Sequence, residues 1–307
     1  MIKRKRRISI AGLGLVRIFK ESLWAWWNDN ALRLGASLSF YTLFAIAPVL
    51  LVAISMAGLV FGTATVHAEL VSQMEGLVGR DGAQAVQALL EGANRRKSGV
   101  FATIVGSITF MLAATGAFLE LQAALNAIWR VAPNPGANLS AYVFDRLRSF
   151  GIVVAIGFLL MVSLVVSAAL AAANAWLDRR APGWPLLWQA VNVAVSFFVT
   201  TALFALLFRF LPDVKLEWRH VATGSVVTAV LFTAGKYLIG LYLAQSTTAS
   251  SYGAAASVML LLLWVYYSSQ ILLFGAEFTR IYSLAAGERP QPEEFAKRDP
   301  NAAVKAT

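Results

Sequence analysis

Charged and amide side chains inside long apolar stretches are the residues of this sequence that could do chemistry. Glu120 is the only charged residue in the stretch 98–129, and Lys236 is the only one in the stretch 221–244. A charged group inside a bilayer costs roughly 3 kcal/mol on insertion scales, so each such residue is a candidate for function. The side chains that could line a transport path or form a polar core are Glu120, Gln122, Asn126, Lys236, Gln270 and Glu277.

Two interpretations of these residues stay open. The first is a polar cavity along a transport path. The second is structural, with Glu120 hydrogen-bonded across helices, Lys236 reaching outward and Glu277 at the membrane interface. A direct ion pair between Glu120 and Lys236 is a further alternative, although their estimated depths differ by about 10 Å. Pro48 interrupts the apolar stretch 34–62 and is either a hinge or a fixed bend.

Enzyme signatures are missing from the sequence. Cysteine is absent, which excludes disulfides, thiol nucleophiles and cysteine-bound metals, and His67 and His220 are the two histidines. Neither a Gly-x-Ser-x-Gly nor a His-Glu-x-x-His motif occurs. The carboxylates of the polar loops are scattered, so we expect no metal, no cofactor, no catalytic residue and no enzymatic activity.

The apolar stretches predict an all-α, polytopic membrane protein. Hydrophobic residues make up 58% of the 307 residues and charged residues 14%, against about 25% charged residues in soluble domains. A spanning helix needs about 20 apolar residues, and six stretches are long enough. The predicted transmembrane helices are 34–62, 98–129, 149–177, 181–208, 221–244 and 253–276.

The distribution of positive charge predicts the orientation of these helices. If the N-terminus is cytoplasmic, 19 of the 26 lysines and arginines fall on the cytoplasmic side and six fall outside. This bias predicts that both termini are cytoplasmic. It also accounts for the net charge of +10, so we expect membrane lipids rather than nucleic acid as partners.

Three segments outside the predicted helices complete the domain organisation. Residues 1–30 form a basic, amphipathic segment with an interfacial helix, and 31–284 form the transmembrane domain. The external loop 64–97 predicts two short amphipathic helices, which lie on the outer leaflet or cap the bundle as a packed lid. Residues 285–307 contain prolines and mixed charge and are predicted to be a disordered cytoplasmic tail.

Four segments carry a resemblance to a known family. They are RLGASLSFYTLFAIAP at 33–48, ALNAIW at 124–129, FLPDVKLEW at 210–218 and YGAAASVMLLLLWVYYSSQILLFGAEF at 252–278. With them, residues 15–285 resemble the YihY/BrkB family of bacterial inner-membrane proteins, although Ala256 stands where the pattern has glycine. The resemblance implies a six-helix inner-membrane protein whose family name records virulence and resistance to killing. An older family label is ribonuclease BN, and the family supplies no agreed catalytic residues.

Three functions follow as hypotheses. The first is a transporter or export factor for a lipid or another envelope component. The second is a non-catalytic membrane scaffold that works with envelope-assembly proteins, and the third is a ribonuclease. A cavity that reaches Glu120 would favour transport, whereas an interior packed through small residues such as Gly224 and Thr228 would favour a scaffold. The sequence leaves the oligomeric state open.

Overall fold

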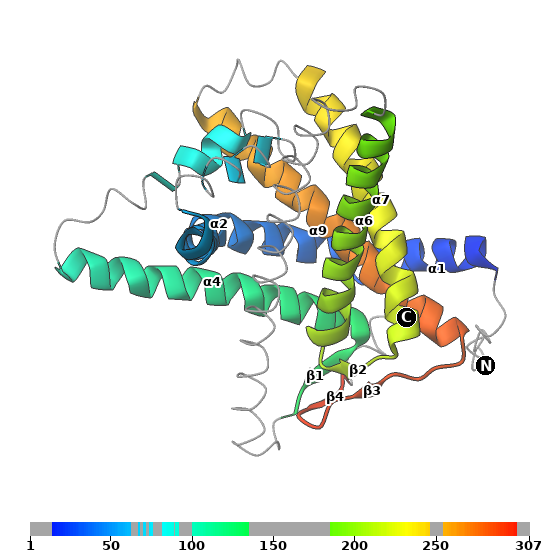
Figure 1. The fold of residues 1–307 in the computed structure, drawn as a ribbon. Coiled ribbons are helices and arrows are strands. Elements are labelled where there is room, and N and C mark those ends of the chain that lie inside the picture. Colours follow the sequence, from blue (N-terminus) through cyan, green and yellow to red (C-terminus); the bar gives the residue numbers. More distant parts are fainter. Residues whose placement is uncertain are drawn as a thin grey trace.

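A computed structural model describes residues 14–62, 100–134, 185–245 and 254–299, together with short stretches between 67 and 91. Figure 1 shows α6 and α7 side by side, α9 running obliquely along α7, and α2 and α4 lying across their direction. The named elements are α1 (Leu15–Asn28), α2 (Ala31–Phe61), α4 (Val100–Trp129), β1 (Val131–Pro133), α6 (Pro185–Phe210), β2 (Val214–Lys215), α7 (Trp218–Gln245), α9 (Ala254–Ala285), β3 (Gln291–Pro292) and β4 (Ala296–Arg298).

The helices coincide with five of the six predicted transmembrane segments, and the third prediction, 149–177, lies outside the described residues. Within the described part, three helical windows are long and apolar enough to cross a bilayer: Val193–Phe210, Trp218–Ile239 and Val258–Ala285. A shorter apolar helix covers Ala31–Ala47. The chain is therefore a helical membrane protein, and α9 extends nine residues past its predicted end at residue 276.

Helices α7 and α9 pack through two reciprocal contacts between glycine and threonine. A Cβ atom on Gly224 would meet the side chain of Thr279, and one on Gly275 would meet Thr228. Each threonine hydroxyl donates to the backbone carbonyl of a glycine on its own helix. The distance is 2.7 Å from Thr228 to Gly224 and 2.7 Å from Thr279 to Gly275. The missing glycine side chains let two antiparallel backbones approach closely, as small residues do in membrane helices.

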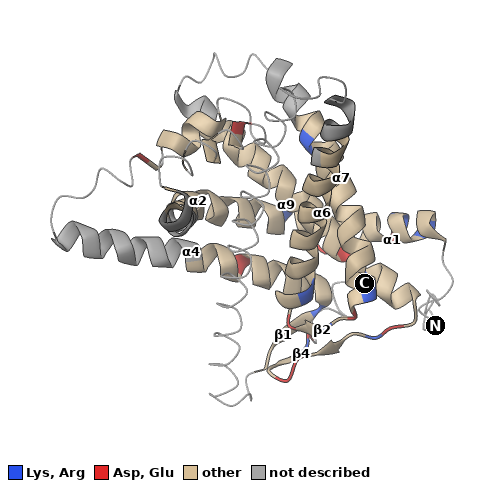
Figure 2. Ribbon diagram, viewed as in Figure 1, with Lys and Arg blue, Asp and Glu red and all other residues tan. Residues whose placement is uncertain are grey.

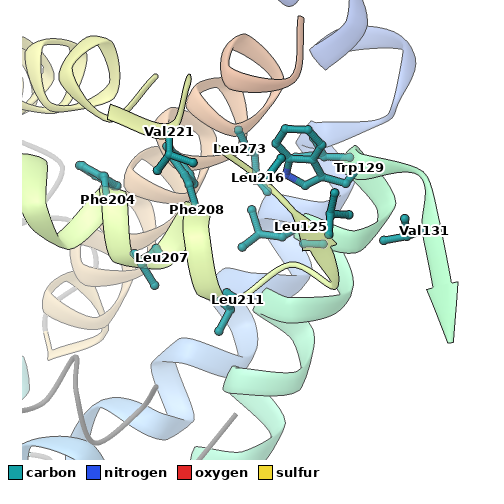
Figure 3. Close-up of a cluster of buried hydrophobic side chains, with 14 of the residues drawn as sticks. Leu125, Trp129, Val131, Phe204, Leu207, Phe208, Leu211, Leu216, Val221 and Leu273 are labelled. Carbon is teal, nitrogen blue, oxygen red and sulfur yellow. The ribbon is translucent and has the colours of Figure 1, made fainter. Parts of the chain in front are cut away.

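One apolar cluster joins five helices, α2, α4, α6, α7 and α9, at the end of the bundle where the short strands lie. Leu125 of α4, Phe208 of α6, Val221 of α7 and Leu273 of α9 belong to it, and all four are fully buried. Figure 3 shows their side chains among Leu211, Leu216 and Trp129 in the same cluster. This packing fixes the ends of α4, α6 and α7, from which the polar side chains of the candidate site project.

Helix α1 packs on α9 along one apolar face. Ile18 and Ala25 are buried against Phe274 and Phe278 of α9. The Phe19 ring also contacts the Phe274 ring, with 5.1 Å between their centres, whereas Leu15, Leu23 and Trp27 are exposed. An exposed apolar face beside a membrane bundle is suited to contact lipid, as expected for an interfacial helix.

Residues of the predicted external loop pack against the bundle. The described positions between 67 and 91 are helical, and Val86 and Leu90 are buried with Leu261 and Val265 of α9. Leucines and isoleucines of α2 line the same cluster. In the described part of the chain, these helical positions therefore pack against α2 and α9.

The prediction of a disordered tail from residue 285 is wrong as far as residue 299. Strand β4 pairs antiparallel with β1, where Val131 faces Arg298, and β3 pairs with β2, where Val214 faces Pro292. The backbone N–H of Glu293 also donates to the carbonyl of Asp213 at 3.0 Å. The prolines of the tail indicate disorder when the sequence is considered alone, but prolines are compatible with edge strands. Residues 300–307 lie outside the described range.

The reciprocal packing predicts that Gly224→Val destabilises the protein. Its side chain would collide with Thr279, and overpacking of this kind costs between about 1 and 3 kcal/mol. Thermal unfolding in detergent should show a lower midpoint for Gly224→Val than for Ala234→Val, a β-branched substitution at an exposed position of the same helix. Equal midpoints for the two variants would contradict close packing at Gly224.

Candidate functional site

Polar side chains gather at one end of the bundle, which we call the polar end. It is formed by the end of α4, the α6–α7 connection, the end of α9 and the corner between α1 and α2. Figure 2 shows charged residues sparse along most of the helices and gathered near β1, β2 and β4. The polar end comprises Gln122, Asn126, Asp29, Arg130, Asp213, Glu217, His220, Glu277, Arg280 and Glu288.

Asp213 fastens the α6–α7 connection to α4. Its carboxylate accepts hydrogen bonds from Asn126 Nδ2 at 2.6 Å and from Gln122 Nε2 at 3.0 Å. The backbone N–H of Asp213 donates to Asn126 Oδ1 at 2.9 Å. All three side chains are buried, and hydrogen bonds to an ionised acceptor are about twice as strong as neutral ones. Two of the predicted polar-core residues therefore bind a carboxylate from a loop.

Asp29 joins two arginines from different helices. Its Oδ2 lies 3.5 Å from Arg130 Nη2 and 3.6 Å from Arg280 Nη2. Arg280 also donates from Nε and Nη2 to Glu277 Oε2, at 3.0 and 2.6 Å. Glu277 is fully buried and Arg280 nearly so. This network joins the α1–α2 corner to the end of α4 and to α9. Removal of one partner would leave a buried charge uncompensated, so the contacts are costly to break.

Gln270 lies in the contact between α9 and α2. A Cβ atom on Gly35 would meet the Gln270 amide, and Ser39 donates its hydroxyl hydrogen to the Gly35 carbonyl at 2.6 Å. Neither Nε2 nor Oε1 of Gln270 has a hydrogen-bond partner among the described residues, although both atoms are buried. An unsatisfied buried amide costs between about 1 and 3 kcal/mol, so this position favours a polar molecule from outside the described chain.

Glu120 lies on the face of α4 that is directed toward α2. A Cβ atom on Gly116 would meet the ring of Tyr41 on α2, and Glu120 follows one turn later on the same face of α4. Its side chain is half-buried. Within the described ranges no basic side chain lies at ion-pair distance from Glu120. Helices α4 and α9 therefore each direct a polar side chain, Glu120 or Gln270, toward the first half of α2. Neither side chain has a protein partner among the described residues.

The structure does not bring Lys236 to these residues. Lys236 is half-buried on α7, with its Nζ 5.6 Å from the centre of the Tyr237 ring. It forms no ion pair with Glu120, since both residues are described and no such contact is present. The backbone of α2 stays helical through Pro48, the predicted hinge.

A second charged group occupies the start of α7 and the end of α9. Glu217, His220 and Glu288 each direct one ligand-capable atom to a point where all three atoms lie within 4.8 Å of one another. Burial raises the pKa of the Glu288 carboxyl, His220 lowers it, and the neighbouring Glu217 raises it further. The expectation that the carboxylates are scattered is wrong for this group, since the turn after α9 brings Glu288 to His220 and Glu217.

Several residues of the polar end escaped the sequence analysis. Arg280 follows Glu277 by three residues, a spacing that places both on one face of a helix, so this pair carries a detectable signal. Asp29 and Glu288 lie in turns between elements, where spacing along the chain predicts no partner. Asp213 lies in the α6–α7 connection, and only the folded connection brings it to Asn126.

Comparison with known proteins identifies what this chain is similar to. A family described as virulence factor BrkB matches residues 23–299, a range that includes the polar end and the paired tail strands. No solved structure matches the chain. The comparison therefore covers most of the sequence and gives no ligand-bound template.

Curated relatives are UPF0761 membrane proteins of bacteria. One from Alkalilimnicola ehrlichii is 29% identical over 267 residues, covering 84% of this chain and 57% of the relative. One from Psychrobacter is 26% identical, covering 86% and 48%. One from Pseudomonas aeruginosa is 29% identical, covering 81% and 58%. The chain thus spans about half the length of the curated relatives it matches.

The hydrogen bonds at Asp213 predict a large effect of Asn126→Ala. This change removes one donor and one acceptor and leaves the buried Asp213 carboxylate with fewer partners, so we expect a loss of between about 1 and 3 kcal/mol. Unfolding by heat or denaturant in detergent measures it. Gln84→Ala, at an exposed amide, is the matched control and should leave the midpoint unchanged. A similar midpoint for both variants would show that the Asp213 contacts contribute nothing.

Proposed function

The chain belongs to the virulence factor BrkB family of membrane proteins, and on this premise we propose that it is a transporter or export factor for a lipid or another envelope component. The observation that carries the proposal is the pair of polar groups beside α2, the half-buried Glu120 carboxylate and the Gln270 amide. The proposal involves no chemical reaction and no nucleic acid. It includes six membrane-spanning helices and a location in the bacterial inner membrane.

The chemistry of these two groups supports passage of an amphiphile. A carboxylate within an apolar helix is expensive in contact with lipid tails, so it should face water or a polar ligand. The Gln270 amide presents a donor and an acceptor without described partners. Both kinds of group suit a phosphate- or hydroxyl-bearing head group, while the apolar flanks of α2 suit its acyl chains.

The two rigid parts of the molecule indicate where movement would occur. Helices α7 and α9 are joined by the glycine–threonine contacts, and the polar end fixes α4 to the α6–α7 connection. By contrast, α2 meets α9 at Gly35 through an amide without described hydrogen bonds. We place the transport path along α2, where the Glu120 and Gln270 side chains lie.

A membrane scaffold remains the second candidate, because one observation favours it. The close α7–α9 packing and the ionic network at Asp29 both stabilise a single arrangement of helices. A scaffold needs such a fixed surface for envelope-assembly partners. Transport and scaffolding differ in whether the Glu120 charge is required.

The proposed topology places both termini in the cytoplasm and the segment 64–97 outside. Its support is the concentration of positive residues near the polar end and the tail. A fluorescent protein fused after Thr307 should fold and fluoresce, whereas alkaline phosphatase inserted after Gly82 should be active in the periplasm. If the two reporters place Thr307 and Gly82 in the same compartment, this topology is wrong.

The transport proposal predicts that Glu120→Gln abolishes function without unfolding the protein. The substitution keeps the shape and hydrogen-bonding capacity of the side chain but removes its charge. A deletion strain should show an altered lipid profile, which wild-type protein restores and Glu120→Gln at matched membrane abundance does not. Lys236→Met should complement more fully, since Lys236 lies away from α2.

Glu294→Gln, a substitution at an exposed carboxylate of the tail, is the control and should complement fully. Full complementation by Glu120→Gln would show that the charge is not required and that Glu120 is a packing residue. An unchanged lipid profile in the deletion strain, together with missing envelope proteins, would favour the scaffold instead.

A further inference from the structure

The group formed by Glu217, His220 and Glu288 brings three side chains that can bind metals to one point. His220 Nδ1 lies 2.7 Å from Glu288 Oε2 and 3.9 Å from Glu217 Oε2. His220 is 4% exposed, so its imidazole is almost completely removed from solvent. The two carboxylates reach the same nitrogen from different segments of the chain.

The short contact between His220 and Glu288 joins two atoms that are almost completely removed from solvent. At 2.7 Å, His220 Nδ1 and Glu288 Oε2 are within hydrogen-bond distance, and Glu217 lies beside them. The three ligand-capable atoms also lie close enough together to turn toward one common cation, with bonds of about 2.0 to 2.2 Å to nitrogen and oxygen.

The local fold holds each of the three residues in place. Glu217 is the residue that precedes α7, and its carbonyl accepts the N–H groups of His220 and Val221. The His220 ring contacts the ring of Tyr282 edge-on, with 5.7 Å between their centres.

Glu288 follows Gly287, whose φ of +88° ends α9 in a left-handed turn that favours glycine. The N–H of Glu288 donates to the carbonyl of Ser283 at 3.0 Å, and that of Gly287 to Leu284 at 3.1 Å. This pair of bonds is the Schellman ending of a helix. It brings Glu288 back to the start of α7.

We propose that Glu217, His220 and Glu288 bind one divalent transition-metal ion at the polar end. One imidazole and two carboxylates suit Zn²⁺ or Mn²⁺, whereas Mg²⁺ and Ca²⁺ prefer oxygen ligands alone. Three protein ligands leave further coordination positions to water. The ion would neutralise two converging carboxylates and join the start of α7 to the end of α9. This site is separate from the proposed path along α2.

Zinc binding to the full chain tests the proposal. The protein is purified in detergent without a polyhistidine tag, stripped with a chelator and titrated with ZnCl₂ by calorimetry, with bound metal counted by mass spectrometry. We expect one Zn²⁺ per chain, and at least about tenfold weaker binding for His220→Ala and Glu288→Gln. His67→Ala, at the other histidine of the chain, should bind like wild type. MgCl₂ should give no saturable binding over the concentration range in which ZnCl₂ saturates the protein.

Glu217→Gln makes the test independent of folding, because the Glu217 side chain is 66% exposed and its substitution should leave the apo protein intact. It should weaken Zn²⁺ binding while the metal-free unfolding midpoint stays at the wild-type value. The proposal is overturned if wild-type protein binds no stoichiometric Zn²⁺, or if the affinity of His220→Ala or Glu217→Gln equals that of wild type. Neither result bears on lipid transport, which the Glu120 variants test separately.

Discussion

The Asp213 carboxylate sets the constraint on which the polar end depends. It is buried, so it must be hydrogen-bonded, and the amides of Gln122 and Asn126 supply the donors from α4. Once Asp213 is held, β2 begins directly after it and presents an edge to β3. The start of α7 follows, and with it the positions of Glu217 and His220. One carboxylate thereby orients the α6–α7 connection, the tail and the histidine cluster.

Charge at the polar end is balanced both across segments and within one helix. Asp29 contacts Arg130, directly after α4, and Arg280 of α9, and Glu277 contacts Arg280 within α9. Replacing such groups with apolar residues is often tolerated, whereas removing one partner is not. The arrangement therefore makes the relative placement of α1, α4 and α9 specific, in a molecule whose remaining helix contacts are largely apolar and shape-dependent.

The helices could be predicted from sequence because uncharged stretches of this length have few alternatives. Gln122, Asn126 and Glu277 could be selected because polar groups in such stretches are rare. Their partners could not, since Asp213 and Asp29 lie in connections whose paths depend on the packed helices. The paired tail was missed for the same reason: strands of two or three residues have no periodicity, and β3 and β4 exist only because β1 and β2 offer edges.

The pairing of the tail with β1 and β2 has a consequence for the order of biosynthesis. Strand β1 ends at residue 133, and its partner β4 begins at residue 296, so most of the chain leaves the ribosome before the two can meet. Until then, the backbone groups of β1 and β2 are open to water or to other chains. Premature termination between residues 286 and 290 would release a protein with all its described helices but without the strands that pair with β1 and β2. Such a product is a natural target for quality-control proteases.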